Sequence, residues 1–68
     1  MKAVSGKQFC KLLEARGWQL KRISGSHFIY AKAGVPVRIL VPVHGDASLK
    51  RGLQRHLMRL AAIDESDL

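Results

Sequence analysis

Three short runs of strand-forming residues, separated only by tight turns, constrain most strongly how this chain can fold. The runs occupy residues 18–23, 27–32 and 37–43, and the turns between them are Ser24-Gly25-Ser26 and Ala33-Gly34-Val35-Pro36. Turns this short cannot hold the crossover that parallel strands need, so the strands must form an antiparallel meander. Pro42 has no N–H to donate to a neighbouring strand, which predicts that it lies at a sheet edge or strand end.

A helix with signals at both ends precedes the strands at residues 5–16. Ser5 is a favourable N-cap residue, and Gln8 three positions later completes a capping box. Gly17 supplies the left-handed residue that ends many helices, and Trp18 can fold back onto the helix as the apolar contact of a Schellman motif. We therefore expect a helix whose ends are fixed by its own neighbouring residues.

A second helix is predicted after the strands, capped by Ser48 or Asp46 and extending to about Ala62. Leucines recur along it at helical spacing and are expected to face the sheet: Leu49, Leu53, Leu57 and Leu60. Arginines recur every four residues and form a basic stripe on another face: Arg51, Arg55 and Arg59. His56 lies near the apolar face, which favours a structural role.

The order helix, three strands, helix predicts an α+β domain in which both helices pack on one face of a three-stranded antiparallel sheet and leave the other face free. A chain of 68 residues allows one domain, which we assign to residues 1–63, followed by an acidic tail at residues 64–68. The single cysteine, Cys10, fits a reducing compartment, and no apolar stretch is long enough to span a membrane. These features predict a small, soluble, cytoplasmic protein.

The charge of the chain is strongly basic and unevenly placed. Twelve lysines and arginines face five acidic residues, for a formal charge of +7. Three of the acids lie in the tail, so residues 1–63 hold twelve basic residues against two acidic ones. Such a density favours a polyanion or an acidic protein as the partner, the alternative being a role in solubility alone.

Histidine is the residue type best suited to acid–base chemistry in this chain. The sequence has no metal-ligand spacing, no phosphate-binding glycine loop and no pair of carboxylates outside the tail, so we expect no metal or cofactor. His27 follows Gly25-Ser26 at the start of a strand, and Lys21 and Arg22 lie on the preceding strand, where they can neutralise a phosphate. A histidine beside cations suits ribose-assisted RNA cleavage, and the alternative is a structural strand histidine.

The other polar and aromatic candidates have simpler interpretations. His44 is either a second site residue or a loop histidine that helps to cap the second helix. Trp18 and Tyr30 are interpreted as core residues, and Cys10 as a small, partly buried hydrophobic residue.

Two motifs in this chain resemble the HicA family of bacterial toxin RNases. Gly25-Ser26-His27 stands between two strands, and Val41-Pro42-Val43-His44 precedes a basic helix. The similarity covers roughly residues 4–63. It implies a fold like that of double-stranded-RNA-binding domains, ribosome-independent cleavage of messenger RNA with His27 as the catalytic residue, and inhibition by a HicB-type antitoxin.

The expected RNA contacts come from both halves of the chain: Lys21, Arg22, Ser26, Lys50, Arg51 and Arg55. Two residues depart from the family pattern. Leu53 and Ala62 stand where relatives commonly have a threonine and a glycine, which leaves the register and the end of the second helix open.

The resulting hypothesis is a metal-independent endoribonuclease toxin in which His27 acts as general base or general acid. It would be monomeric when free and hetero-oligomeric with its antitoxin. One alternative is a non-catalytic RNA-binding module of the same fold, and another is a basic subunit that binds only an acidic protein.

Overall fold

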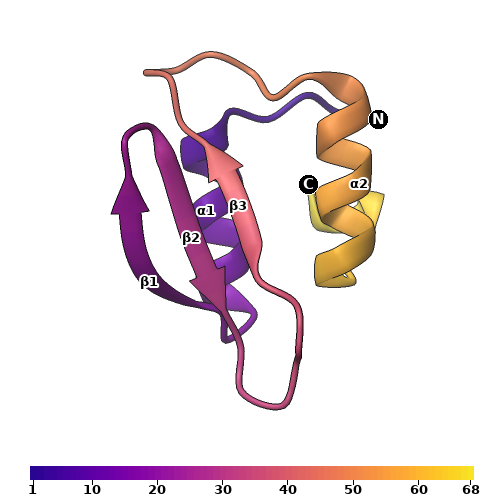
Figure 1. Ribbon diagram of the computed structural model, residues 1–68. Helices are drawn as coiled ribbons and strands as arrows, with labels where there is room; N and C mark the ends of the chain where they lie inside the picture. Colours follow the sequence, from indigo (N-terminus) through magenta and orange to yellow (C-terminus); the bar gives the residue numbers. More distant parts are fainter.

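The computed structural model describes residues 1–68 and has the predicted order of elements (Figure 1). These are α1 (Gly6–Ala15), β1 (Gln19–Ser24), β2 (His27–Ala31), β3 (Ile39–Pro42), α2 (Arg51–Ala61) and the short 3-10 helix η1 (Glu65–Asp67). The α+β class is therefore confirmed. Neither α1 nor α2 is long and apolar enough to cross a membrane.

The sheet is the predicted antiparallel meander, with the strands in the order β1-β2-β3. One row across it pairs Ser24 with His27 and His27 with Pro42. Because β3 is an edge strand that ends at Pro42, the missing N–H of this proline breaks no internal ladder. The third strand is shorter than predicted, since residues 35–38 belong to the loop before it.

The predicted end signals of α1 are all present. The Ser5 hydroxyl accepts a hydrogen bond from the Gln8 N–H at 3.1 Å, and the Gln8 side chain accepts one from the Ser5 N–H at 2.9 Å. At the other end Gly17 has a φ of +88°, and the Trp18 N–H donates to the Leu13 carbonyl at 3.0 Å. This is the Schellman geometry that the sequence predicts.

Gly6 lets the first turn of α1 approach the end of β3 closely. A Cβ atom at Gly6 would overlap the Pro42 carbonyl oxygen and lie 3.2 Å from the Val43 Cα. Both of these are backbone atoms that cannot move aside cheaply. The glycine therefore fixes how α1 sits against the strand that leads into the His44 loop.

The start of α2 differs from the prediction. Its N-cap is Lys50, and no side chain caps it. The two expected caps have other partners: Ser48 forms an isolated β-bridge with Ser5, and the Asp46 carboxylate lies 3.8 Å from the Lys7 ammonium. The bridge holds the backbone at Ser48 in an extended conformation, so α2 begins two residues later than it would with Ser48 as its cap.

The buried face of α2 is also rotated from the predicted one. Leu49, just before the helix, and Leu57 are buried as expected, but Leu53 is half-buried and Leu60 is exposed. The inward positions are instead completed by Gln54, Met58 and Ala61. His56 is exposed, which corrects its predicted place near the apolar face.

Gln54 explains this rotation, because its fully buried amide binds the backbone of the N-terminal segment. Its Oε1 accepts from the Val4 N–H at 3.2 Å, and its Nε2 donates to the Lys2 carbonyl at 2.7 Å. Val4 in turn accepts from the Leu49 N–H at 2.9 Å. A polar residue can thus occupy a core position, because its amide forms the hydrogen bonds that a neighbouring strand would otherwise supply to this backbone.

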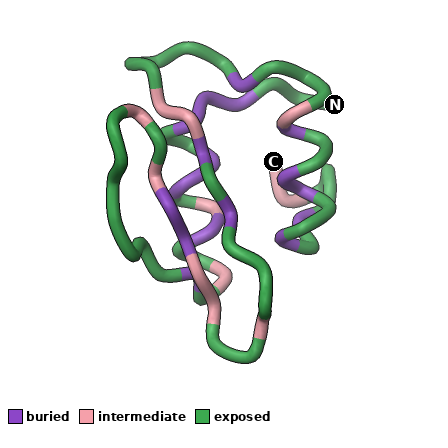
Figure 2. The backbone as a smooth tube through the Cα atoms, in the orientation of Figure 1, coloured by how far each residue is buried: buried purple, intermediate pink, exposed green.

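One hydrophobic core lies between the helices and the sheet, and the buried residues of the chain are purple in Figure 2. It includes the predicted core residues Trp18, Tyr30 and Cys10. α1 lies behind the sheet and α2 beside β3, so the opposite face of the sheet carries no helix (Figure 1).

The acidic tail folds back onto the domain. The Met1 ammonium lies 3.3 Å from the Glu65 carboxylate, and Arg16 at the end of α1 pairs with Asp67. Arg16 also donates to the Ala62 carbonyl at 3.5 Å. The tail therefore connects the ends of both helices and the N-terminus.

Candidate functional site

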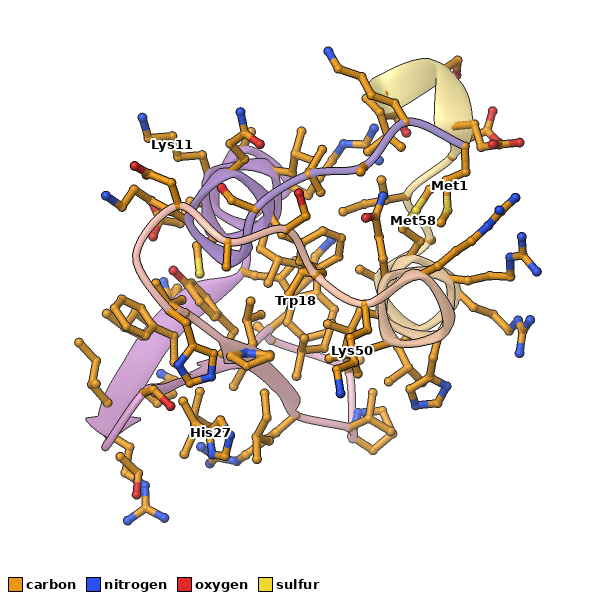
Figure 3. All side chains as sticks on the ribbon, turned by 90° about the horizontal axis from the view of Figure 1, so that it is seen from above. Met1, Lys11, Trp18, His27, Lys50 and Met58 are labelled. Carbon is orange, nitrogen blue, oxygen red and sulfur yellow. The ribbon has the colours of Figure 1, made fainter.

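His27 is exposed on the face of the sheet that carries no helix. Phe28 and Tyr30 pack toward the core, and because strand side chains alternate, His27 and Ile29 lie on the opposite face. Figure 3 shows His27 on the far side of the sheet from Lys11 of α1. Its side chain is thus available to a ligand approaching this face.

The turn before His27 lies beside the segment that leaves β3. Gly25 adopts the left-handed conformation with a φ of +60°, which the tight turn needs. The Val43 N–H donates to the Ser26 carbonyl at 2.8 Å and continues the β2–β3 ladder beyond the His27–Pro42 pair. The two motifs noted in the sequence are therefore neighbours in space.

A hollow of about 420 Å³ extends from this point toward the start of α2. It is lined by Pro42, His44, Ala47, Ser48, Leu49, Lys50 and Leu53. Pro42 is the link, because it pairs with His27 and also lines the hollow. Lys50 and His27 lie on the same side of the molecule in Figure 3.

A β-bulge decides which of the two cations predicted on β1 lies on the face of His27. Leu20 pairs with Tyr30, and Arg22 with Ile29, so Lys21 is the extra residue. Arg22 lies on the helix-free face, two residues along β1 from Ser24, the partner of His27. Lys21 instead lines a hollow of about 320 Å³ at the other end of the sheet, together with Lys32 and Arg38.

The arginines of α2 point away from His44 and Lys50. Arg51 lines a hollow with Met1 and Ala3, and Arg55 lines another with Arg59 and the tail residue Glu65. Among the predicted RNA contacts, the structure thus groups Arg22, Ser26 and Lys50 around the His27 end of the sheet. It places Lys21, Arg51 and Arg55 further away.

The groups with shifted pKa values lie outside this site. The Tyr30 hydroxyl donates to a Glu14 carboxylate oxygen at 2.7 Å, and burial together with its hydrogen bonds raises the pKa of Tyr30. Burial also raises the pKa of the Cys10 thiol. Both residues face the core. No three histidine, cysteine or acidic side chains come together in the way a metal ion requires.

A family model described as the HicA toxin of bacterial toxin-antitoxin systems matches residues 6–63. The chain belongs to the HicA toxin family. The match runs from the first residue of α1 to the residue after the C-cap of α2, and so includes His27 and every residue of the hollow. Comparison with curated proteins gave no match.

Membership of this HicA family implies an antitoxin as a partner. The matched region leaves out the acidic tail, in agreement with the predicted resemblance. Ala62, which departs from the family pattern, is the C-cap of α2 and adopts the left-handed conformation with a φ of +56°. α2 therefore ends where a glycine would end it, although the residue is an alanine.

Proposed function

We propose that this HicA-family toxin is an endoribonuclease that cleaves messenger RNA independently of the ribosome, with His27 as its catalytic residue. The observation that carries the proposal is the place of His27: exposed on the helix-free face, with Arg22 on one side and the Lys50 hollow on the other. A histidine in this position can contact the phosphodiester backbone of a bound RNA, and it does not pack into the protein's own core.

The chemistry is ribose-assisted cleavage. The 2′-hydroxyl of the RNA loses its proton and attacks the adjacent phosphorus, and the bond to the 5′-oxygen breaks. His27 acts as acid or base for one of these proton transfers. Arg22 and Lys50 stabilise the charge that develops on the phosphate oxygens, so the proposed reaction uses no metal ion.

RNA binding would extend from this centre along the surface. Arg22, Ser26 and Lys50 are proposed to contact the phosphates next to the cleaved bond. Lys21 at the far end of the sheet, and Arg51 and Arg55 on the outer side of α2, would contact phosphates further along the strand. Such contacts are electrostatic and independent of sequence, so affinity should fall steeply with salt.

A HicB-type antitoxin is the proposed inhibitor. The helix-free face bears the exposed apolar side chain of Leu40 beside its cations. An antitoxin with an acidic, partly apolar surface would cover this face and displace RNA. Binding to the folded toxin would also stabilise a chain with so small a core. The proposed location of this pair is the cytoplasm, where messenger RNA is found.

The cleavage test is a time course with a defined single-stranded RNA and pure protein in the presence of chelator. We expect fragments from the wild type and from His56→Ala, which removes an exposed histidine outside the site. We expect none above background from His27→Ala. Equal cleavage by His27→Ala would contradict the proposal, and intact RNA in every sample with binding retained would favour a non-catalytic RNA-binding module.

The position of the RNA is tested with a matched pair of lysines. Lys50→Ala and Lys11→Ala each remove one exposed positive charge, but Lys11 lies on the opposite side of the molecule (Figure 3). We expect Lys50→Ala to weaken binding to a non-cleavable RNA and to reduce its salt dependence, with little effect of Lys11→Ala. Equal effects of the two variants would contradict the proposed RNA path.

A further inference from the structure

His44 is an exposed histidine to which neither the fold nor the proposed role of His27 gives a task. It accepts one backbone hydrogen bond, from the Ala47 N–H at 3.0 Å, through its carbonyl group and not through its ring. It does not cap α2, whose N-cap is Lys50. His44 instead lines the hollow that also includes Pro42, the strand partner of His27.

The register of the sheet brings His44 close to His27. His27 pairs with Pro42, and the Val43–Ser26 hydrogen bond continues the same ladder by one residue. His44 comes next, two residues after Pro42 and just past the end of β3, so the alternation of side chains along this ladder assigns it to the helix-free face as the diagonal neighbour of His27. Diagonal neighbours have Cα atoms about 7–8 Å apart, a separation at which two imidazole rings can contact one phosphodiester from two sides.

We propose that His44 is the second acid–base residue of the cleavage reaction and complements His27. The inference rests on the proposed endoribonuclease function and completes it, because cleavage by transesterification moves two protons. One must leave the attacking 2′-hydroxyl, and one must reach the departing 5′-oxygen. A single histidine in one protonation state does only one of these tasks.

The two imidazoles together balance the reaction. A neutral ring accepts the proton of the 2′-hydroxyl while the new bond forms between the 2′-oxygen and phosphorus. A protonated ring donates its proton to the 5′-oxygen as the bond between phosphorus and that oxygen breaks. The products are a 2′,3′-cyclic phosphate and a 5′-hydroxyl, and the histidine pair holds the same number of protons before and after.

The charged groups around His44 suit this role. Lys50 lines the same hollow and can hold the phosphate between the two rings. Arg22 lies on the other side of His27, across the sheet. The one carboxylate of the loop, Asp46, is 3.8 Å from the Lys7 ammonium of α1, which partly offsets its charge. The charged groups near the proposed phosphate position are thus mainly positive.

The first test compares His44→Ala with His56→Ala on unmodified RNA. We expect His44→Ala to lower the single-turnover cleavage rate by about 100-fold or more, as is usual for a general acid or base, and His56→Ala to leave it unchanged. Affinity for the same RNA carrying 2′-O-methyl groups, which cannot be cleaved, should be equal in all three proteins. A cleavage rate of His44→Ala equal to that of the wild type overturns the inference.

The second test uses an RNA with sulfur in place of the 5′-oxygen at the cleaved bond. A thiolate leaves without being protonated, so this substrate needs a base but no acid. We expect it to restore one of the two variants, His27→Ala or His44→Ala, to near the wild-type rate and to leave the other impaired. The restored variant lacks the acid. Impairment of His44→Ala on both substrates to the same extent, with His27→Ala not restored either, overturns the inference.

Failure of the inference and failure of the proposed function give different results. If His27 is not catalytic, His27→Ala cleaves both RNAs like the wild type. If His27 is catalytic but His44 is not its complement, His27→Ala is impaired, and either His44→Ala cleaves like the wild type or the sulfur-containing RNA restores neither variant.

Discussion

The two helices contrast in how their ends are fixed. The ends of α1 are closed by adjacent residues, with Ser5 and Gln8 at one end and Gly17 at the other. The N-cap of α2, Lys50, forms no side-chain capping hydrogen bond, and its C-cap, Ala62, adopts a conformation that favours glycine. The difference shows that the ends of α1 are specified locally, whereas α2 is held by contacts from distant parts of the chain and leaves its first turn open beside the proposed site.

The largest expected effect breaks the contact between α1 and β3. Gly6→Ala would drive a methyl group into the Pro42 carbonyl, so we expect the free energy of unfolding to fall by about 3 kcal/mol. Gly52→Ala is the matched control in α2, where nothing lies within 4 Å, and it should raise stability by about 1 kcal/mol. Urea titrations followed by fluorescence of the buried Trp18 measure both, and a loss of stability in both variants would contradict the close contact of Gly6 with Pro42 as the cause.

A smaller loss is expected from the residue that holds α2. Gln54→Ala leaves the Val4 N–H and the Lys2 carbonyl without their partners, so stability should fall by about 2 kcal/mol. Gln19→Ala removes an exposed glutamine from β1 and should change stability by less than about 0.5 kcal/mol. Equal urea midpoints for the two variants would show that the Gln54 amide does not hold α2.

The C-cap of α2 gives an effect of opposite sign. Ala62→Gly relieves the left-handed backbone of an alanine and should raise stability by about 1 kcal/mol. Ala15→Gly, at the end of α1, relieves nothing and should lower stability by about 0.5–1 kcal/mol. Thermal unfolding of the two variants tests these opposite changes in stability. A lower melting temperature in both variants would contradict the prediction for Ala62.

The smallest effect concerns the tail that connects the helix ends. The hydrogen bond from the Asp64 N–H, with Arg16 as the second cause, lowers the pKa of Asp67 below its ordinary value of 3.8. A lowered pKa in the folded state stabilises above the ordinary pKa, and this gain is lost as the pH falls through the lowered value. Asp67→Asn should thus melt below the wild type at neutral pH, and the difference should disappear in strong acid. A difference that is constant with pH would exclude the carboxylate as its source.

The sequence predicted best those parts of the fold that depend on near neighbours. The Ser5 capping box, the Gly17 stop and the three-stranded meander all rest on residues a few positions apart, and all are confirmed. Gly6 and Gln54 could not be interpreted in this way, because the Pro42 carbonyl and the Val4 N–H that explain them are distant in the sequence. The predicted cap of α2 and the predicted inward position of Leu60 were wrong for the same reason.

For the candidate site, the residue types were predictable but their grouping was not. Lys21 and Arg22 are adjacent on a strand and so lie on different faces, but a bulge that no sequence signal marks decides that Arg22, and not Lys21, shares the face of His27. The pairing of His27 with Pro42 depends on the register across a loop, which turn chemistry alone does not set. Only that register brings Pro42, and with it the segment that leads to His44, beside His27.

The most direct test of RNA cleavage at this face is the identity of the ends it produces. Mass spectrometry of fragments from a defined RNA, released by wild-type protein and absent with His27→Ala, should find 5′-hydroxyl ends together with 2′,3′-cyclic phosphates. These ends require attack by the 2′-hydroxyl of the RNA, as a histidine-catalysed reaction predicts. Fragments with 5′-phosphate ends would show that water attacks instead, and would contradict the proposed role of His27.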